Sequence, residues 1–72
     1  MIEYPIVLEK EDDGRYSVYA PDLPGCTSWG IDREAAIEHI REAIELWIES
    51  ALAEGEEIPK PGSNLEYVKI AG

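Results

Sequence analysis

The apolar side chains of this sequence change their spacing once, near residue 30, and no other feature restricts the possible folds as strongly. Before that point, residues 2–9 and 15–20 alternate between apolar and polar side chains, which is typical of half-buried strands. After it, apolar side chains recur every three or four positions from about residue 33 to 54, which predicts one amphipathic helix. The sequence therefore predicts an α+β fold in which a single long helix packs on one face of an antiparallel sheet.

Turn-forming and capping residues separate these segments. Asp13 and Gly14 predict a tight turn between the first two strands, because Asp-Gly pairs tolerate positive φ angles. Asp32 is a good N-cap for the helix, and Gly55 is expected to end it. The boundaries of the helix are therefore predicted from local chemistry as well as from the apolar pattern.

Two shorter strands complete the predicted order. Residues 21–25, Pro-Asp-Leu-Pro-Gly, break the alternation and predict a fixed loop. A third strand is predicted at residues 26–29 and a last one at residues 65–70, so the expected order is β-β-β-α-β. Pro5 has no N–H to donate, which predicts that the first strand lies at an edge of the sheet or turns this residue away from its neighbour.

The size of the chain limits its core. With 72 residues and 8.0 kDa, the chain is expected to form one domain over residues 1–72, and a domain this small buries only about 60% of its unfolded surface. Its single cysteine excludes an internal disulfide, and one cysteine with one histidine argues against a zinc site, so we expect no metal and no cofactor. We therefore predict a homo-oligomer, a dimer or a tetramer, in which a second chain adds to the core.

The charge is strongly negative. Sixteen acidic residues against six basic ones give a formal net charge of −10, which suits a basic partner and not nucleic acid, since Lys and Arg carry phosphate contacts. No apolar run approaches the length of a membrane span, and the N-terminus does not resemble a signal peptide. The lone thiol fits a reducing compartment, so we expect a cytoplasmic protein without direct contact to a membrane.

One face of the predicted sheet is left uncovered. If Tyr16 and Val18 face the helix, then Tyr19 lies on the opposite face, together with Val7 and Trp29. A single helix covers only one face, so these three side chains form an exposed apolar patch. Such a patch is either ordinary scattered surface or an interface, and the small core favours the interface.

The acidic loop residues admit a catalytic alternative. Asp12, Asp13, Asp22 and Asp32 all lie in loops or at the ends of elements, where metal-dependent nucleases place their ligands. Each also has a structural explanation, because Asp12 and Asp13 suit a hairpin turn, Asp22 a proline turn and Asp32 a helix cap. We favour the structural explanation and expect no enzymatic activity.

The remaining candidate nucleophile is Cys26. It follows a glycine at the start of a short strand, which is more typical of a small buried side chain than of a reactive thiol. Its only possible base is His39, on the helix, and no acyl-transfer motif surrounds either residue. We therefore expect Cys26 to be buried and His39 to lie at the border of the apolar stripe.

Residues 13–30 carry the most specific motif of the chain. They read DGRYSVYAPDLPGCTSWG, which resembles the HicB family of antitoxins and its short HicB-like members, whose pattern is roughly D-G-x-Y-x-V-x-x-P-D-L-P-G-C-x-S-x-G. The later acid–alanine and A-I-E-L features of that family match Glu34, Ala36 and residues 43–46. The resemblance covers about residues 1–54. Asp32 stands where the family usually has a Thr cap, and Ala35 replaces one acid of the helix start, so the reciprocal capping box is missing.

The resemblance implies a partial ribonuclease-H-like α+β domain that binds and neutralises a small RNA-cleaving toxin, HicA. Full-length members also carry a C-terminal DNA-binding domain, which we do not expect here. The resemblance and the uncovered face together point to a set of residues that bind the partner or form the oligomer interface: Val7, Tyr19, Asp22, Pro24 and Trp29. Two alternatives stay open, a small metal-dependent nuclease and a stand-alone oligomeric domain with a changed function.

Overall fold

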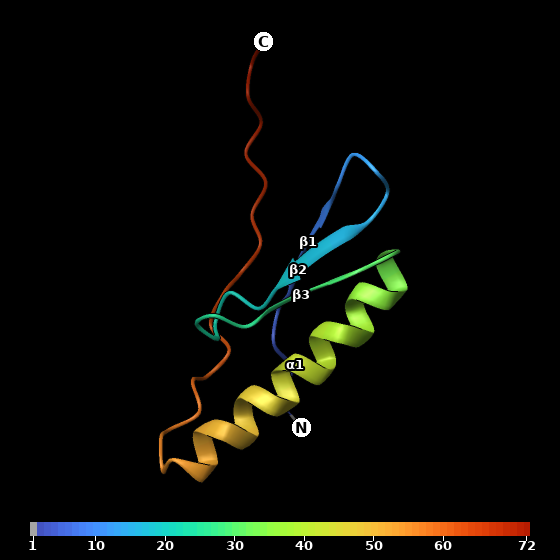
Figure 1. Cartoon of the computed structure of the whole chain (residues 1–72). Helices are drawn as coiled ribbons and strands as arrows, with labels where there is room; N and C mark the ends of the chain where they lie inside the picture. The colour runs from blue at the N-terminus through green and yellow to red at the C-terminus, as the bar shows by residue number, and fades with distance from the viewer. Residues whose placement is uncertain (1) are drawn as a thin grey trace.

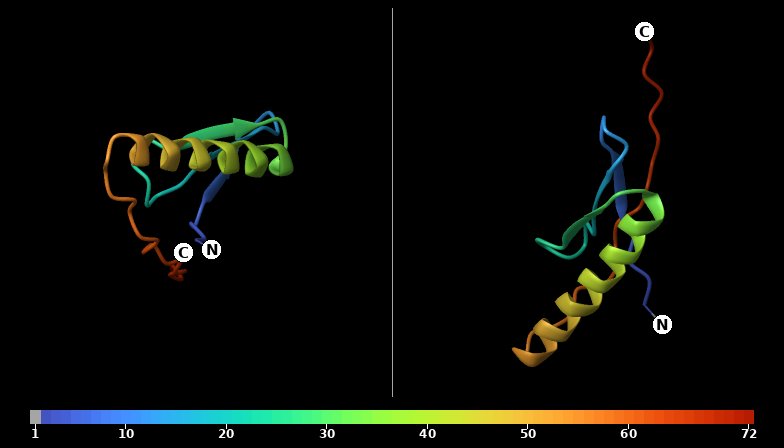
Figure 2. Two further views of the ribbon diagram at one scale, coloured as in Figure 1. Left: turned by 90° about the horizontal axis from the view of Figure 1, so that it is seen from below. Right: turned by 45° about the vertical axis from the view of Figure 1, so that its right-hand side comes forward.

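The four regular elements form two layers. The computed structural model describes residues 2–72, in which the elements are β1 (Val7–Lys10), β2 (Tyr16–Tyr19), β3 (Thr27–Gly30) and α1 (Arg33–Ala53). The strands form an antiparallel sheet in the order β1-β2-β3, and α1 packs along one face of it (Figures 1 and 2). The predicted α+β layout of one long helix on an antiparallel sheet is thereby confirmed.

The register of the strands sorts the side chains as the alternation predicted. Leu8 pairs with Val18, which pairs with Ser28, and this row faces the helix. Val18 is only 1% exposed, and Tyr16 and Leu8 pack against the same cluster. The alternate row faces away from the helix and forms the outer face of the sheet.

The core is small and lies between β2, β3 and the first half of α1. Its fully buried cluster is Val18, Ala20, Leu23, Cys26, Ala36 and Ile40. Sheet and helix approach each other closely at Gly30, where an added Cβ would lie 2.2 Å from the backbone nitrogen of Ala36. A side chain at this position is therefore excluded by space, although its φ is not in the left-handed region.

Both ends of α1 follow the predicted capping chemistry. The Asp32 carboxylate accepts a hydrogen bond of 2.8 Å from the backbone N–H of Ala35, which satisfies one of the free donors of the first turn. At the other end, Gly55 adopts φ +74° and its N–H donates to the carbonyl of Leu52. The helix consequently ends where the sequence predicted it.

Three strand boundaries differ from the prediction. The ladder of β1 begins at Val7 and not at residue 2, since Pro5 cannot donate and residues 2–6 have no strand beside them. The third strand begins at Thr27 and extends to Gly30, because the N–H of Cys26 is used by the preceding loop, where it donates to the carbonyl of Leu23. The last difference is larger and concerns the C-terminal segment.

The prediction of a strand at residues 65–70 is wrong for the single chain. This segment is extended but pairs with no strand of the described residues, and it leaves the body of the molecule (Figure 1). Its composition has high β-propensity, but a strand also needs a neighbour to pair with. The large side chains of the segment are 72–89% exposed.

Candidate functional site

The outer face of the sheet brings three of the predicted site residues together. Val7 pairs directly with Tyr19, and Trp29 lies one diagonal step from Tyr19 across β2 and β3. Tyr19 is 38% exposed and Trp29 54% exposed, while Val7 is partly buried. We call Val7, Tyr19 and Trp29 the outer patch, and the structure places it on the face opposite α1, as the alternation predicted.

Acidic residues border one end of the outer patch. The turn between β1 and β2 carries Glu11, Asp12 and Asp13, and it lies beside Trp29 around an open hollow of about 460 Å³. The Ser17 hydroxyl, in this hollow, donates a hydrogen bond to the Glu11 carboxylate. An aromatic ring next to carboxylates suits a ligand that is both cationic and apolar.

Arg15 lies beside the acidic turn and contacts both the Trp29 ring and the Asp13 carboxylate. Its guanidinium carbon is 5.8 Å from the ring centroid of Trp29, and its Nε donates a 2.7 Å hydrogen bond to Asp13. This hydrogen bond is the main cause that holds the pKa of the Asp13 carboxyl below its usual value. Both partners are more than half exposed, so the ion pair contributes little stability, but it places a cation over the Trp29 ring.

The backbone beneath Trp29 is fixed from the helix side. The Nδ1 atom of His39 lies 2.6 Å from the carbonyl oxygen of Trp29, and because a carbonyl only accepts, Nδ1 donates in this bond. Sequence reasoning placed His39 at the border of the apolar stripe but missed this contact. Its only sequence signal is a polar side chain at the edge of the apolar stripe.

The described hydrogen bonds of Pro24 and Asp22 are with α1 and with the C-terminal segment. Both lie in the loop between β2 and β3, whose shape is set by Leu23: this side chain is 1% exposed and anchors the loop in the core. The carbonyl of Pro24 accepts a 2.9 Å hydrogen bond from the indole Nε1 of Trp47, so the loop is tied to α1. The structure therefore shows that Pro24 contacts the helix.

Asp22 holds the C-terminal segment. Its carboxylate accepts hydrogen bonds from the backbone N–H groups of Gly62 and Ser63, at 3.2 and 3.3 Å, and from the Ser63 hydroxyl at 2.6 Å. These bonds, the one from the Ser63 hydroxyl first, lower the pKa of Asp22 below its usual value. Forty residues separate the partners, so the sequence offered no signal for this contact.

The lowered pKa of Asp22 predicts how the C-terminal segment responds to acid. Because the carboxylate form makes the bonds, their stabilisation is fully present above the ordinary pKa of 3.8 and is lost as the pH falls through the lower folded-state pKa. We expect the amide NMR signals of Gly62 and Ser63 to titrate with a midpoint below 3.8. Asp22→Asn should remove this titration, whereas Asp12→Asn should leave it unchanged; a midpoint at 3.8 or above in the unaltered protein would contradict the contact.

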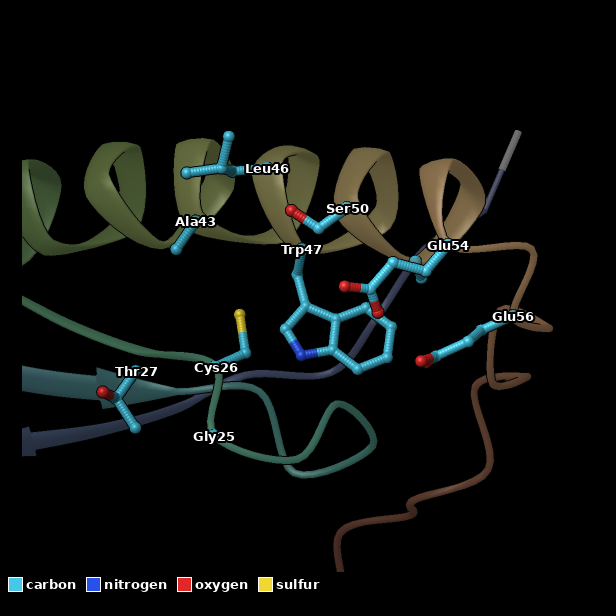
Figure 3. A pocket seen from close by; sticks show the side chains of 10 residues that line it. Gly25, Cys26, Thr27, Ala43, Leu46, Trp47, Ser50, Glu54 and Glu56 are labelled. Atoms are coloured by element: carbon cyan, nitrogen blue, oxygen red, sulfur yellow. The ribbon is translucent and has the colours of Figure 1, made fainter.

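The thiol of Cys26 lies in a pocket of about 410 Å³ between the start of β3 and the C-terminal half of α1 (Figure 3). Trp47 fills its centre, and Glu54 and Glu56 lie at its far end. Cys26 is free and buried, and its burial raises the pKa of the thiol, which disfavours the reactive thiolate. The described contacts of His39 are with Trp29, so no hydrogen bond of the structure joins the two candidate residues.

Three of the four acidic residues considered as metal ligands serve separate local roles. Asp13 pairs with Arg15, Asp22 with Ser63, and Asp32 caps α1. Within residues 2–72, no group of three or more His, Cys, Asp or Glu side chains is arranged to hold a metal ion. α1 is also too polar to cross a membrane, and the described residues contain no other helix that would do so.

The fold and the uncovered patch define a small α+β domain with a helix on one sheet face and an open opposite face. The family model of HicB-like antitoxins of bacterial toxin–antitoxin systems matches residues 4–71. The chain therefore belongs to the HicB-like antitoxin family.

Individual relatives agree with this assignment. The N-terminal domain of the antitoxin HicB from Burkholderia pseudomallei has a similar structure, with a TM-score of 0.76 and 38% identity over 85% of this chain and 72% of that one. A UPF0150 protein of Synechocystis is 53% identical over 79% of this chain and 72% of its own. Antitoxin HicB 1 of Photorhabdus laumondii is 36% identical over 96% of this chain, which spans 45% of that longer protein.

Proposed function

We propose that this protein binds and neutralises a small, basic, RNA-cleaving toxin of the HicA type, and that the outer patch is the surface that binds it. The observation that carries the proposal is the juxtaposition of exposed Trp29 and Tyr19 with the acidic turn of residues 11–13, in a member of an antitoxin family. We place this inhibition in the cytoplasm, where a free thiol such as Cys26 stays reduced.

The net negative charge of the chain supports binding to a basic toxin. A protein that cleaves RNA has to attract a polyanion and is expected to be basic, whereas this chain has a net charge of −10. The carboxylates beside Trp29 would then occupy basic side chains that otherwise contact RNA phosphates. Inhibition follows from competition for the same cationic surface.

The exposed aromatic side chains also support toxin binding at the outer patch. Trp and Tyr are the commonest anchors of protein interfaces, because they bury large areas and lose little side-chain entropy. Trp29 projects from a strand whose backbone is fixed by β2 and by His39, so little further order has to be imposed on binding. We therefore expect the patch to control how slowly the complex dissociates.

The test is inhibition of RNA cleavage by a co-purifying basic protein. The tagged chain, expressed in its source cell and recovered at low salt, should retain a small basic protein that cleaves RNA once it is separated. Cleavage should stop near a one-to-one ratio when the chain is added back, and the chain alone should leave RNA intact with Mg²⁺ or Mn²⁺. Recovery of a basic protein whose RNA cleavage is unaffected by the chain would refute neutralisation.

Salt should act mainly on the rate of association with the toxin. Rim charges steer encounter, and they are screened beyond about 8 Å at physiological salt. Raising the salt from about 50 to 500 mM should slow association by about tenfold and leave dissociation nearly unchanged, as measured by surface plasmon resonance. An association rate that is constant over this range would mean that the acidic residues serve solubility alone.

Charge reversal on the helix supplies the control for the docking face. Glu42 and Glu45 are exposed on α1, which lies on the sheet face opposite the outer patch. Replacing both with Lys changes the net charge from −10 to about −6, as much as two such replacements in the turn of residues 11–13 would. We expect the helix variant to bind with nearly unchanged dissociation, and a large loss would move the docking site to α1.

A further inference from the structure

The pocket between the start of β3 and the C-terminal half of α1 has apolar walls and an acidic end. Its volume of about 410 Å³ lies in the lower part of the roughly 300–1,000 Å³ range of small-molecule sites. We call it the helix-end pocket. The residues that the argument uses are Cys26, Ala43, Leu46, Trp47, Glu54 and Glu56 (Figure 3).

The acidic end of this pocket is electrostatically unfavourable in the single chain. Glu54 is the C-cap of α1, and the last turn of the helix contains no basic residue. The free carbonyls of a helix C-terminus carry partial negative charge, which repels carboxylates and attracts cations. The described ion pairs of residues 2–72 include neither Glu54 nor Glu56. The charge at this end therefore has no counter-charge among the described residues, and such local conflicts are expected at functional sites.

Trp47 supplies a fixed aromatic wall beside these carboxylates. Its indole Nε1 donates a 2.9 Å hydrogen bond to the carbonyl of Pro24, and its ring packs against the core cluster. Because the one polar atom of the ring already has a partner, the rest of the ring acts as an apolar surface that also attracts cations. Figure 3 shows the six-membered ring on the side of Glu54 and Glu56.

The thiol of Cys26 forms the opposite, buried end of the pocket. Cys26 is 4% exposed and free, and its sulfur points from the chain before β3 toward α1 (Figure 3). None of the described side-chain hydrogen bonds uses this thiol. A buried thiol is a small, polarisable and weakly polar group. This end of the pocket therefore suits an alkyl group and not a second charge.

We infer that the helix-end pocket binds a small aliphatic amine. Its ammonium group lies at Glu54 and Glu56, where it forms charge-assisted hydrogen bonds and neutralises the end of α1. Its alkyl chain lies along Trp47 toward Cys26, where apolar surface is removed from water. An anion would be repelled by both carboxylates, and an inorganic cation would leave the apolar walls uncovered. This is a second ligand, separate from the proposed toxin.

Three probes separate the contributions of charge and alkyl chain. In an NMR titration at about 150 mM salt, n-hexylamine should shift the indole N–H signal of Trp47 to saturation and leave that of Trp29, on the outer patch, in place. Ethylamine has the same charge but four fewer methylene groups, and n-hexanol has the same chain without the charge. Each should bind at least about tenfold more weakly than n-hexylamine. No saturable shift of Trp47, or equal binding of ethylamine and n-hexylamine, would overturn the inference.

A pair of matched variants tests the acidic end. The double variant Glu54→Gln, Glu56→Gln should weaken binding of n-hexylamine at least about tenfold. Glu42→Gln, Glu45→Gln changes the net charge equally on the same helix and should keep the affinity within about twofold, because these carboxylates lie outside the pocket. All four side chains are exposed, so circular dichroism should show unchanged helix content. An equal loss in both variants would mean that the amine is only a counterion of an acidic protein.

Nuclear Overhauser effects locate the alkyl chain. The methyl and adjacent methylene protons of bound n-hexylamine should show contacts to the β-protons of Cys26 and to the ring protons of Trp47. Contacts to Trp29 in place of these would put the amine on the outer patch and overturn the inference. None of these measurements involves a toxin, so their outcome is independent of the proposed inhibition.

Discussion

Replacing Gly30 with alanine is expected to lower the free energy of unfolding by about 3 kcal/mol or more, a large part of the 5–15 kcal/mol typical of natural domains. The new Cβ would lie 2.2 Å from the nitrogen, and 2.7 Å from the Cα, of Ala36. These are backbone atoms, so no side-chain rotation relieves the contact, and α1 has to move away from β3. Urea unfolding followed by circular dichroism measures the effect.

Gly62→Ala is the matched control for this substitution. A Cβ at Gly62 would meet its nearest atom at 3.9 Å, which is ordinary contact, and the N–H that Asp22 binds is retained. The unfolding midpoint of this variant should stay close to that of the unaltered protein. Equal midpoints for the two variants would mean that the helix does not approach β3 as closely as described.

Replacing Trp29 with alanine is expected to weaken binding of the toxin by about 2 kcal/mol or more, which is about 30-fold in the dissociation constant. The loss should appear mainly as faster dissociation, because the ring is an anchor and carries no charge. The Trp29 ring is 54% exposed. The hydrogen bond from His39 goes to the backbone carbonyl of residue 29, which alanine keeps. Stability of the free protein should therefore change little.

Leu52→Ala provides the comparison for Trp29→Ala. Leu52 is also large, apolar and exposed, at 60%, but it lies near the end of α1, away from the outer patch. Surface plasmon resonance should show unchanged dissociation for this variant. If both substitutions accelerate dissociation equally, the toxin does not select the outer patch.

Local chemistry was sufficient to predict most of the fold. The alternation around Val18 and the three-to-four spacing around Ile40 identify the two layers, because each pattern reports a face that is buried. Asp32 and Gly55 mark the helix ends through contacts made within four residues along the chain. The outer patch follows from the same alternation, since whatever does not face the helix faces outward.

The parts that the sequence did not predict depend on residues far apart in the chain. The bond from His39 to Trp29 spans ten positions, that from Trp47 to Pro24 spans twenty-three, and that from Ser63 to Asp22 spans forty-one. The pattern of side chains along the sequence does not show which distant carbonyl or carboxylate will lie near a given donor in the fold. Residues 65–70 illustrate the same limit, because β-propensity is a property of the segment, whereas a strand also needs a neighbour to pair with.

The position of Arg15 affects how strongly a cationic partner can bind to the Trp29 ring. The face of the indole is not vacant: the chain's own guanidinium lies over it, held there by Asp13. A cationic side chain that stacks on the side of the ring covered by Arg15 has to displace Arg15, so binding there exchanges one cation for another. The measured affinity is then a difference between two similar interactions, and a lysine or arginine that brings no further contacts gains almost nothing. The ring thus selects partners by what surrounds their cation rather than by the cation itself.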